Sequence, residues 1–299
     1  MVRVLADQYK QLERTTTLME AMVARQKQED KWRRRVRRQL DALMRSHYVR
    51  ESGFSPPTNV VGRRFVLHSQ NEEDGITLAL LEMAGVVGRR FAEIGCGAKG
   101  GNSAILAFEF GWSGVMIDAN PVHLEGLRRQ LLPNRAVSLA CATVSSRNVN
   151  TVLREHGVSG EIDLLSIDVD SCDYWVFDAL DACTPRVVVI EYNALFGPDR
   201  AVTLPDQPLP ASIPKGYFGA SLAALEKVAR RKGYRLVVCE PSGMNAFFVR
   251  NDLAPELPGL TPAEAFRVAV DRRSLVDPRP VDIDIYRRIA EEGLPLVEV

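Results

Sequence analysis

Apolar residues in the central part of the chain gather into short runs that alternate with amphipathic stretches. The runs at residues 90–94, 114–118, 136–144, 162–168, 186–193, 234–240 and 245–250 predict strands, with helices between the first six. This alternation predicts an α/β protein with a parallel, doubly wound sheet, whose ligands bind at the carboxyl ends of the strands. The last two runs are too close in sequence for a crossover connection. They predict a hairpin, so the last of seven strands should run antiparallel in a mostly parallel sheet.

The pattern on either side of this region predicts four segments. Residues 1–50 contain neither proline nor glycine, and their apolar positions from Leu5 to Val23 follow the steps of four and three of a coiled coil. They predict a helical extension that packs on its own domain or forms a homodimer. Residues 51–61 predict a linker, residues 62–252 the catalytic domain, and residues 253–299 a helical tail.

Composition narrows the protein class. The chain has 299 residues, of which 46% are hydrophobic and 25% charged, as in an ordinary globular protein. No apolar run reaches the ~20 residues of a membrane span, and the N-terminus lacks a signal peptide, so the expected location is the cytoplasm. The five cysteines contain no C-x-x-C pair, which favours buried free thiols over disulfides or zinc. A basic run at residues 25–38 is interpreted as a solvated helix face, and nucleic acid is not an expected partner.

The most informative segment is FAEIGCGAKGG, residues 91–101, followed by GVMIDAN, residues 114–120. It predicts a strand, a glycine-rich turn, a helix and a second strand that ends in Asp118. Glycines such as Gly95 and Gly97 let the backbone approach a ligand, and Asp118 can accept hydrogen bonds from ribose hydroxyls. This layout suits a cofactor that contains adenosine. G-x-G-x-x-G leaves two classes open, a nicotinamide dehydrogenase and a methyltransferase.

Two features favour the methyltransferase. Glu93 stands two residues before the first glycine, where a carboxylate would repel the pyrophosphate of a dinucleotide. The predicted terminal hairpin is the second feature, because the dinucleotide fold lacks an antiparallel closing strand.

Several motifs in the same order resemble the class I S-adenosylmethionine-dependent methyltransferases, and within them the FkbM-like O-methyltransferases. These motifs are SQNEEDG, AEIGCG, LLSIDVDSCDYW, VVVIEYNALFG, YFGASLAAL and NAFFVR, within residues 65–250. The resemblance implies methyl transfer from S-adenosylmethionine to a hydroxyl of a small molecule or sugar, with Glu93 facing the positively charged methionine end of the cofactor. The residues expected to bind the cofactor are Gln70, Glu93, Gly95, Gly97, Asn102, Asp118 and Asp168. The chain departs from the FkbM pattern after the fourth strand, where it has Asp168-Val169-Asp170-Ser171.

Acidic residues cluster after the fourth and fifth predicted strands. Asp168, Asp170 and Asp173 follow one strand, and Glu191 and Asn193 end the next. Asp168, Glu191 and Asn193 loosely match the magnesium ligands of some O-methyltransferases, and such an ion would orient a bound hydroxyl. Alternatively, Asp168 fixes the cofactor or a loop, and Asp170 and Asp173 cap the next helix.

A proton acceptor is needed in either case, and the candidate catalytic residues are Asp168, Asp170 and His68. His123 and His156 are interpreted as exterior residues. The proline-rich stretch at residues 194–219 is the predicted acceptor-binding wall. Two other functions remain open, an NAD-dependent oxidoreductase and a non-catalytic scaffold with a methyltransferase-like fold.

Overall fold

A computed structural model describes residues 59–132, 134–207, 214–271 and 279–299, together with four helical residues nearer the N-terminus, Met19, Met22, Val23 and Gln26. The chain divides into two compact units, Met1–Glu51 and Ser52–Val299. The basic run, the homodimer contact and most of the linker lie outside the described residues, as does the predicted coiled-coil stripe apart from Met19 and Val23, which are helical and exposed. The fold below is that of the second unit.

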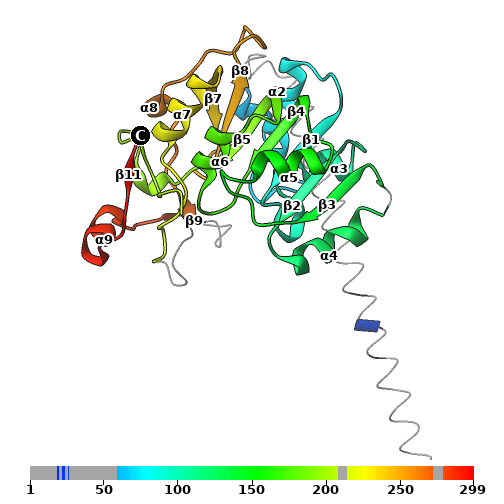
Figure 1. Ribbon diagram of the computed structural model, residues 1–299, viewed down its shortest axis with the longest axis horizontal. Helices are drawn as coiled ribbons and strands as arrows, with labels where there is room; N and C mark the ends of the chain where they lie inside the picture. The colour runs from blue at the N-terminus through cyan, green and yellow to red at the C-terminus, as the bar shows by residue number, and fades with distance from the viewer. Residues whose placement is uncertain are drawn as a thin grey trace, which may run out of the picture. The chain divides into compact units, whose positions relative to one another are not determined.

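Seven strands form one sheet in the order β3-β2-β1-β4-β5-β8-β7 (Figure 1). Their bounds in that order are Val137–Cys141, Ser113–Asp118, Arg90–Ile94, Gly160–Ile167, Cys183–Glu191, Asn245–Arg250 and Tyr234–Cys239. β8 pairs antiparallel with both β5 and β7, whereas the pairs among β3, β2, β1, β4 and β5 are parallel. The all-parallel dinucleotide order has no such reversed strand. The chain therefore has the class I methyltransferase fold, as predicted.

Helices cover both faces of the sheet, and each face has its own apolar core. α2 (Glu73–Ala84), α3 (Ala104–Phe108) and α4 (Pro121–Gln130) pack with one set of strand side chains. α5 (Val149–Glu155), α6 (Asp173–Ala179) and α7 (Leu222–Arg231) pack with the alternate set. Successive residues of a strand point to opposite faces, so these two cores explain the near-continuous apolar runs of the sequence.

Short elements complete the unit. They are the 3-10 helices η1 (Val61–Arg63), η2 (Gly97–Lys99), η3 (Gly101–Ser103) and η4 (Ala194–Phe196), the helices α8 (Pro262–Ala265) and α9 (Ile285–Glu292), and the two-residue strands β6 (Val202–Thr203), β9 (Val270–Asp271), β10 (Arg279–Pro280) and β11 (Val297–Glu298). The tail beyond residue 252 is therefore not purely helical. None of the helices in the described parts of the chain has the length and apolar character to cross a membrane.

Two helices begin at clear side-chain caps. Asn120 accepts from Val122 N at the start of α4, and Thr261 and Glu264 form the reciprocal capping box of α8. β3 is shorter than predicted. It ends at Cys141 because its partner β2 ends at the paired residue, Asp118, and beyond this point the ladder has no second strand.

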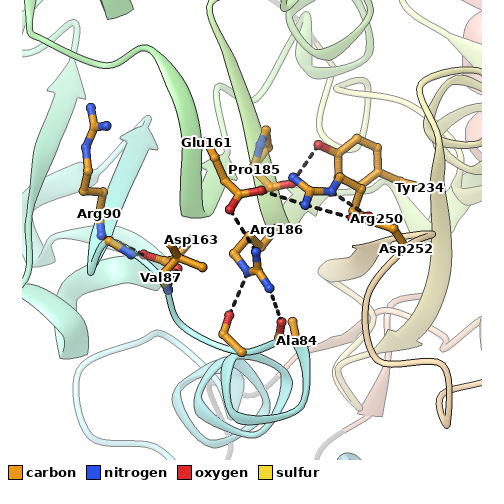
Figure 2. Close-up of polar contacts among 12 residues, drawn as sticks. Ala84, Val87, Arg90, Glu161, Asp163, Pro185, Arg186, Tyr234, Arg250 and Asp252 are labelled. Atoms are coloured by element: carbon orange, nitrogen blue, oxygen red, sulfur yellow. Dashed lines mark hydrogen bonds and ion pairs between the residues drawn. The ribbon is translucent and has the colours of Figure 1, made fainter.

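A polar network fastens the amino edge of the sheet, opposite the carboxyl ends (Figure 2). The buried Asp163 accepts from the backbone N–H groups of Val87 (2.7 Å), Gly88 (3.1 Å) and Arg90 (3.0 Å). Arg186 donates to the carbonyls of Ala84 and Gly85 at the end of α2 and to Glu161. These bonds hold α2 and the start of β1 against β4 and β5, and they leave the carboxyl edge for the site.

Candidate functional site

The strand register brings the chemical residues into one row at the carboxyl edge. Ile94 pairs with Ile117 and Ile167, and Ile167 pairs with Ile190; all four isoleucines belong to the core under α5, α6 and α7. The next residue of each strand turns to the opposite face. These next residues are Gly95, Asp118, Asp168 and Glu191, and Asn245 lies opposite Glu191 across β5 and β8.

The glycine turn begins with a close approach between two backbone segments. Gly95 has φ +86°, and a Cβ atom there would lie 1.5 Å from the carbonyl oxygen of Asp168. Only glycine fits this position. By contrast, no atom lies within 4 Å of the place where a Cβ on Gly97 would stand. The backbone at Gly97 therefore borders open space, which suits a turn that receives a ligand.

The side chain of Glu93 holds the residues after this turn through hydrogen bonds. It is fully buried and accepts from Asn102 N (3.2 Å), Ser103 N (2.8 Å) and Ser103 Oγ (2.6 Å). Burial raises the pKa of Glu93 to about 7, although these hydrogen bonds oppose the shift. Asn102 in turn donates to Ser166 Oγ at 3.1 Å. The expected contact of Glu93 with the methionine end of a cofactor is thus not the arrangement found, because both carboxylate oxygens hold the Gly101–Ser103 segment.

Asp118 stands at the end of β2 beside the glycine turn, with 11% of its side chain exposed. Its Oδ2 accepts from Gly97 N at 2.7 Å, and its Oδ1 accepts from Asn120 N at 2.7 Å. His123 Nδ1 lies 3.2 Å from the same Oδ1. His123 was expected to be an exterior residue without a role. The sequence contained a signal for this contact, because the side chain of the third residue of a helix can reach back toward the N-cap.

Asp168 and Glu191 form a close pair of carboxyl groups at the ends of neighbouring strands. Asp170 completes the group, since oxygens of all three residues lie within 4.8 Å of one another. Burial raises the pKa of both Asp168 and Glu191 well above the ordinary range, and the neighbouring acids raise it further. The strongest charge effects on this acid cluster (Asp168, Asp170 and Glu191) therefore come from its own members and other acids.

The loop between β4 and α6 presents the exposed member of the acid cluster. The buried Asp173 accepts from Val169 N (2.8 Å) and Ser171 N (3.1 Å), and burial raises its pKa to about 6. Asp170 lies at the tip of the loop with φ +56°, in the left-handed region that non-glycine residues rarely adopt. The predicted capping of the next helix by Asp170 and Asp173 is wrong: the N-cap of α6 is Cys172, without a side-chain cap bond, because Asp173 holds the preceding loop and Asp170 joins the acid cluster.

Asn193 does not join the acid cluster. Its Oδ1 accepts from Leu195 N at 3.0 Å, and its Nδ2 donates to the carbonyls of Gly216 (2.8 Å) and Phe218 (2.9 Å). Of the predicted ligand set, Asp168 and Glu191 lie together and Asn193 does not, because its amide closes the loop after β5; the third acid beside them is Asp170.

His68 and Gln70 do not belong to the acid cluster either. His68 Nε2 lies 2.7 Å from Glu109 Oε1, and its ring packs edge-on against Phe108 at a centroid distance of 5.2 Å. These partners lie at the end of α3, so the structure gives His68 an anchoring contact in place of the expected catalytic one. Gln70 is exposed.

Asn245 and Glu73 were not among the site residues predicted from the sequence. Asn245 Nδ2 donates to Glu73 Oε1 at 2.9 Å, and burial, followed by the charge of Glu240, raises the pKa of Glu73. Two buried atoms, Asn245 Oδ1 and Glu191 Oε2, have no hydrogen-bond partner among the described residues. Unpartnered buried acceptors mark places where a donor from water or ligand is expected. The signal was the asparagine that opens the motif NAFFVR beside the acid-bearing strand.

Comparisons with known proteins give only distant similarities. No protein-family model and no curated protein matches the chain. Among solved structures, an S-adenosylmethionine-dependent methyltransferase from Clostridium acetobutylicum is 11% identical over 58% of this chain and 88% of its own, with a TM-score of 0.38. TehB from Haemophilus influenzae is 10% identical over 59% of this chain and 62% of its own, with a TM-score of 0.37.

A third similar structure is the N-terminal domain of EvdMO1 with SAH bound, 14% identical over 61% of this chain and 81% of its own, with a TM-score of 0.39. The chain thus spans less than two thirds of TehB. Similarity this low carries no argument about activity. The fold rests on the sheet order, and the function has to be inferred from the site.

Proposed function

We propose that this protein is an S-adenosylmethionine-dependent methyltransferase that acts on a hydroxyl of a small molecule or sugar in the cytoplasm. The observation that carries the proposal is the sheet order, in which β8 runs antiparallel between β5 and β7. A dinucleotide-binding oxidoreductase has no reversed strand at this place.

The residues at the carboxyl edge fit a cofactor that is positively charged at one end and carries a ribose. Open space borders Gly97, and Asp118 stands beside it with lone pairs left for ribose hydroxyls. Asp168 lies next in the row, and Gln70 is exposed. Gly95 and Asn102 would shape the turn, and Glu93 would support it from below. The acid cluster, acted on chiefly by other acids, favours a cationic ligand.

Bound S-adenosylmethionine supplies a methyl group on its sulfonium. An acceptor oxygen can bond to the methyl carbon in line with the carbon–sulfur bond, which breaks so that the sulfide leaves. The work left to the protein is alignment of the acceptor and removal of its proton. Asp170 is the exposed member of the acid cluster and is proposed as the proton acceptor. Asp168, which lies close to Glu191, would then hold the acceptor hydroxyl beside Asp170.

Magnesium is a second candidate for the same place, because Asp168, Asp170 and Glu191 offer three close oxygen ligands. One observation speaks for transfer without the metal, because the amide of Asn193 is committed to the loop after β5. We therefore propose metal-independent transfer.

Transfer of a labelled methyl group from S-adenosylmethionine to a panel of hydroxylated phenols and glycosides tests the activity. Asp170→Asn should lower kcat by at least about a hundredfold, the usual contribution of a general base, while cofactor affinity stays within about threefold. Asp178→Asn is the matched control, because Asp178 bonds to Arg231 on the outer side of α6. Equal activity of both variants would remove Asp170 from the reaction.

A further inference from the structure

The loop after β5 shares an apolar core with the C-terminal residues. This core is separate from the two sheet cores, and its buried members are Phe196, Val202, Leu204, Tyr217 and Ile285. Residues 194–207 and 214–220 are called the acceptor wall below, and residues 285–299 the strap. The wall supplies four of the five side chains and the strap supplies Ile285, with Ile289, Leu294 and Leu296 packed around them. The two segments therefore form one packed unit.

Hydrogen bonds join the same two segments. β11 of the strap pairs antiparallel with β6 of the acceptor wall, and Val299 N donates to the Ala201 carbonyl at 3.0 Å. Two tyrosine hydroxyls add one bond each. Tyr217 in the wall donates to the Pro295 carbonyl, and Tyr286 in the strap donates to the Phe196 carbonyl at 2.8 Å. The strap thus ties both ends of the wall.

The acceptor wall also lies against the segment that carries the acid cluster. Trp175 Nε1, two residues after Asp173, donates to the Leu204 carbonyl at 2.7 Å. A Cβ atom on Gly219 would stand 3.8 Å from Asp173 Oδ2. Asn193, two residues after Glu191, holds the Gly216 and Phe218 carbonyls. The wall is therefore fixed to the ends of both β4 and β5, the strands that bear the acids.

We propose that the strap holds the acceptor wall in its binding shape, and that Tyr217 and Tyr286 are positioning residues that set acceptor specificity. The inference rests on the proposed function, since it assigns the wall to the acceptor side of that site. The strap contacts described above all fall on the wall, whereas the glycine turn and Asp118 lie at the ends of β1 and β2. Loosening the strap should therefore change acceptor binding and leave cofactor binding intact.

The test compares the full-length protein with Tyr217→Phe, Tyr286→Phe and the double variant. Each substitution removes one hydroxyl and keeps the ring. Tyr234→Phe is the matched control, because it removes a hydroxyl that donates to the Pro185 carbonyl at 2.7 Å in the amino-edge region (Figure 2). Hydrogen exchange of wall and strap peptides should rise together by about tenfold in the double variant, while exchange in β1 is unchanged. The control should leave the wall and strap unchanged.

Two further measurements separate positioning from general stability. The affinity for S-adenosylmethionine, measured by calorimetry, should stay within about twofold in the double variant. In methyl transfer to nitrophenyl glycosides and dihydroxyphenols, KM for the acceptor should rise at least about fivefold with kcat little changed. The inference would be overturned if hydrogen exchange in the double variant rose in only one of the two segments, or if the double variant lost cofactor affinity. If the unsubstituted protein transfers no methyl group, the proposed function fails, and hydrogen exchange still decides whether strap and wall form one unit.

Discussion

Replacement of Glu93 by glutamine should change how the stability of the protein depends on pH. The buried Glu93 has a pKa raised from 4.5 to about 7 by desolvation. The folded state therefore keeps this proton up to near neutral pH, whereas the unfolded chain releases it at much lower pH. The contribution of Glu93 to stability is fully present below pH 4.5 and is lost as the pH rises toward about 7.

The size of this loss follows from the two pKa values. One pKa unit corresponds to about 1.4 kcal/mol, so the full difference is worth about 3 kcal/mol. Most of it, about 2–3 kcal/mol, falls between about pH 5 and about pH 8. A glutamine at position 93 cannot ionise. It loses part of the hydrogen bonding to Asn102 N and Ser103 at every pH. Its contribution to the free energy of unfolding therefore does not change with pH.

Urea unfolding of the unsubstituted protein and of Glu93→Gln, at about pH 5 and about pH 8, measures this loss of stability. The free energy of unfolding of the unsubstituted protein should fall by about 2–3 kcal/mol more than that of Glu93→Gln as the pH rises. The raised pKa of Asp173 acts in both proteins, whereas the pKa of Asp168, which the charge of Glu93 also raises, adds a smaller difference of its own. Glu125→Gln, on the exposed side of α4, controls for the substitution itself. A constant difference between the unsubstituted protein and Glu93→Gln at both pH values would refute the reasoning.

Three other changes have expected outcomes. Asp118→Ala should weaken S-adenosylmethionine binding at least about tenfold, because bonds to a charged acceptor contribute roughly 1.5–3 kcal/mol each; unchanged affinity in calorimetry would remove Asp118 from the site. Methyl transfer should persist in excess chelator, since Asn193 is committed to the loop after β5; activity that is lost and then restored by magnesium would show a metal site at the acid cluster. Asp163→Ala should lower the free energy of unfolding by about 3 kcal/mol, because it removes the acceptor of three part-buried backbone N–H groups, each bond contributing about 1 kcal/mol. Cofactor affinity should not change in Asp163→Ala, and a parallel loss of affinity would argue against separate amino and carboxyl edges.

The elements that could be predicted from the sequence are those fixed by local pattern. β1 and β8 have the predicted bounds, because an apolar run depends on neighbouring residues only. The reversed direction of β8 was also predictable, since the turn after β7 is too short for a crossover.

The contacts within the site could not be predicted, because they depend on register and on distant partners. Asn245 faces Glu191 only through the pairing of β5 with β8. His68 is held by Glu109, 41 residues away. Asn193 lies on the expected strand end, yet its side chain turns to the carbonyls of Gly216 and Phe218. Such choices depend on tertiary packing, which a motif does not encode.

Calorimetry with three ligands tests the central proposal most directly. The full-length protein is titrated in turn with S-adenosylmethionine, S-adenosylhomocysteine and NAD, and the titrations are repeated with Asp118→Ala. We expect one S-adenosylmethionine and one S-adenosylhomocysteine to bind per chain, no binding of NAD, and at least about tenfold weaker binding to the variant. Binding of NAD in preference to S-adenosylmethionine, or binding of none of the three, would contradict the assignment of this site to methyl transfer.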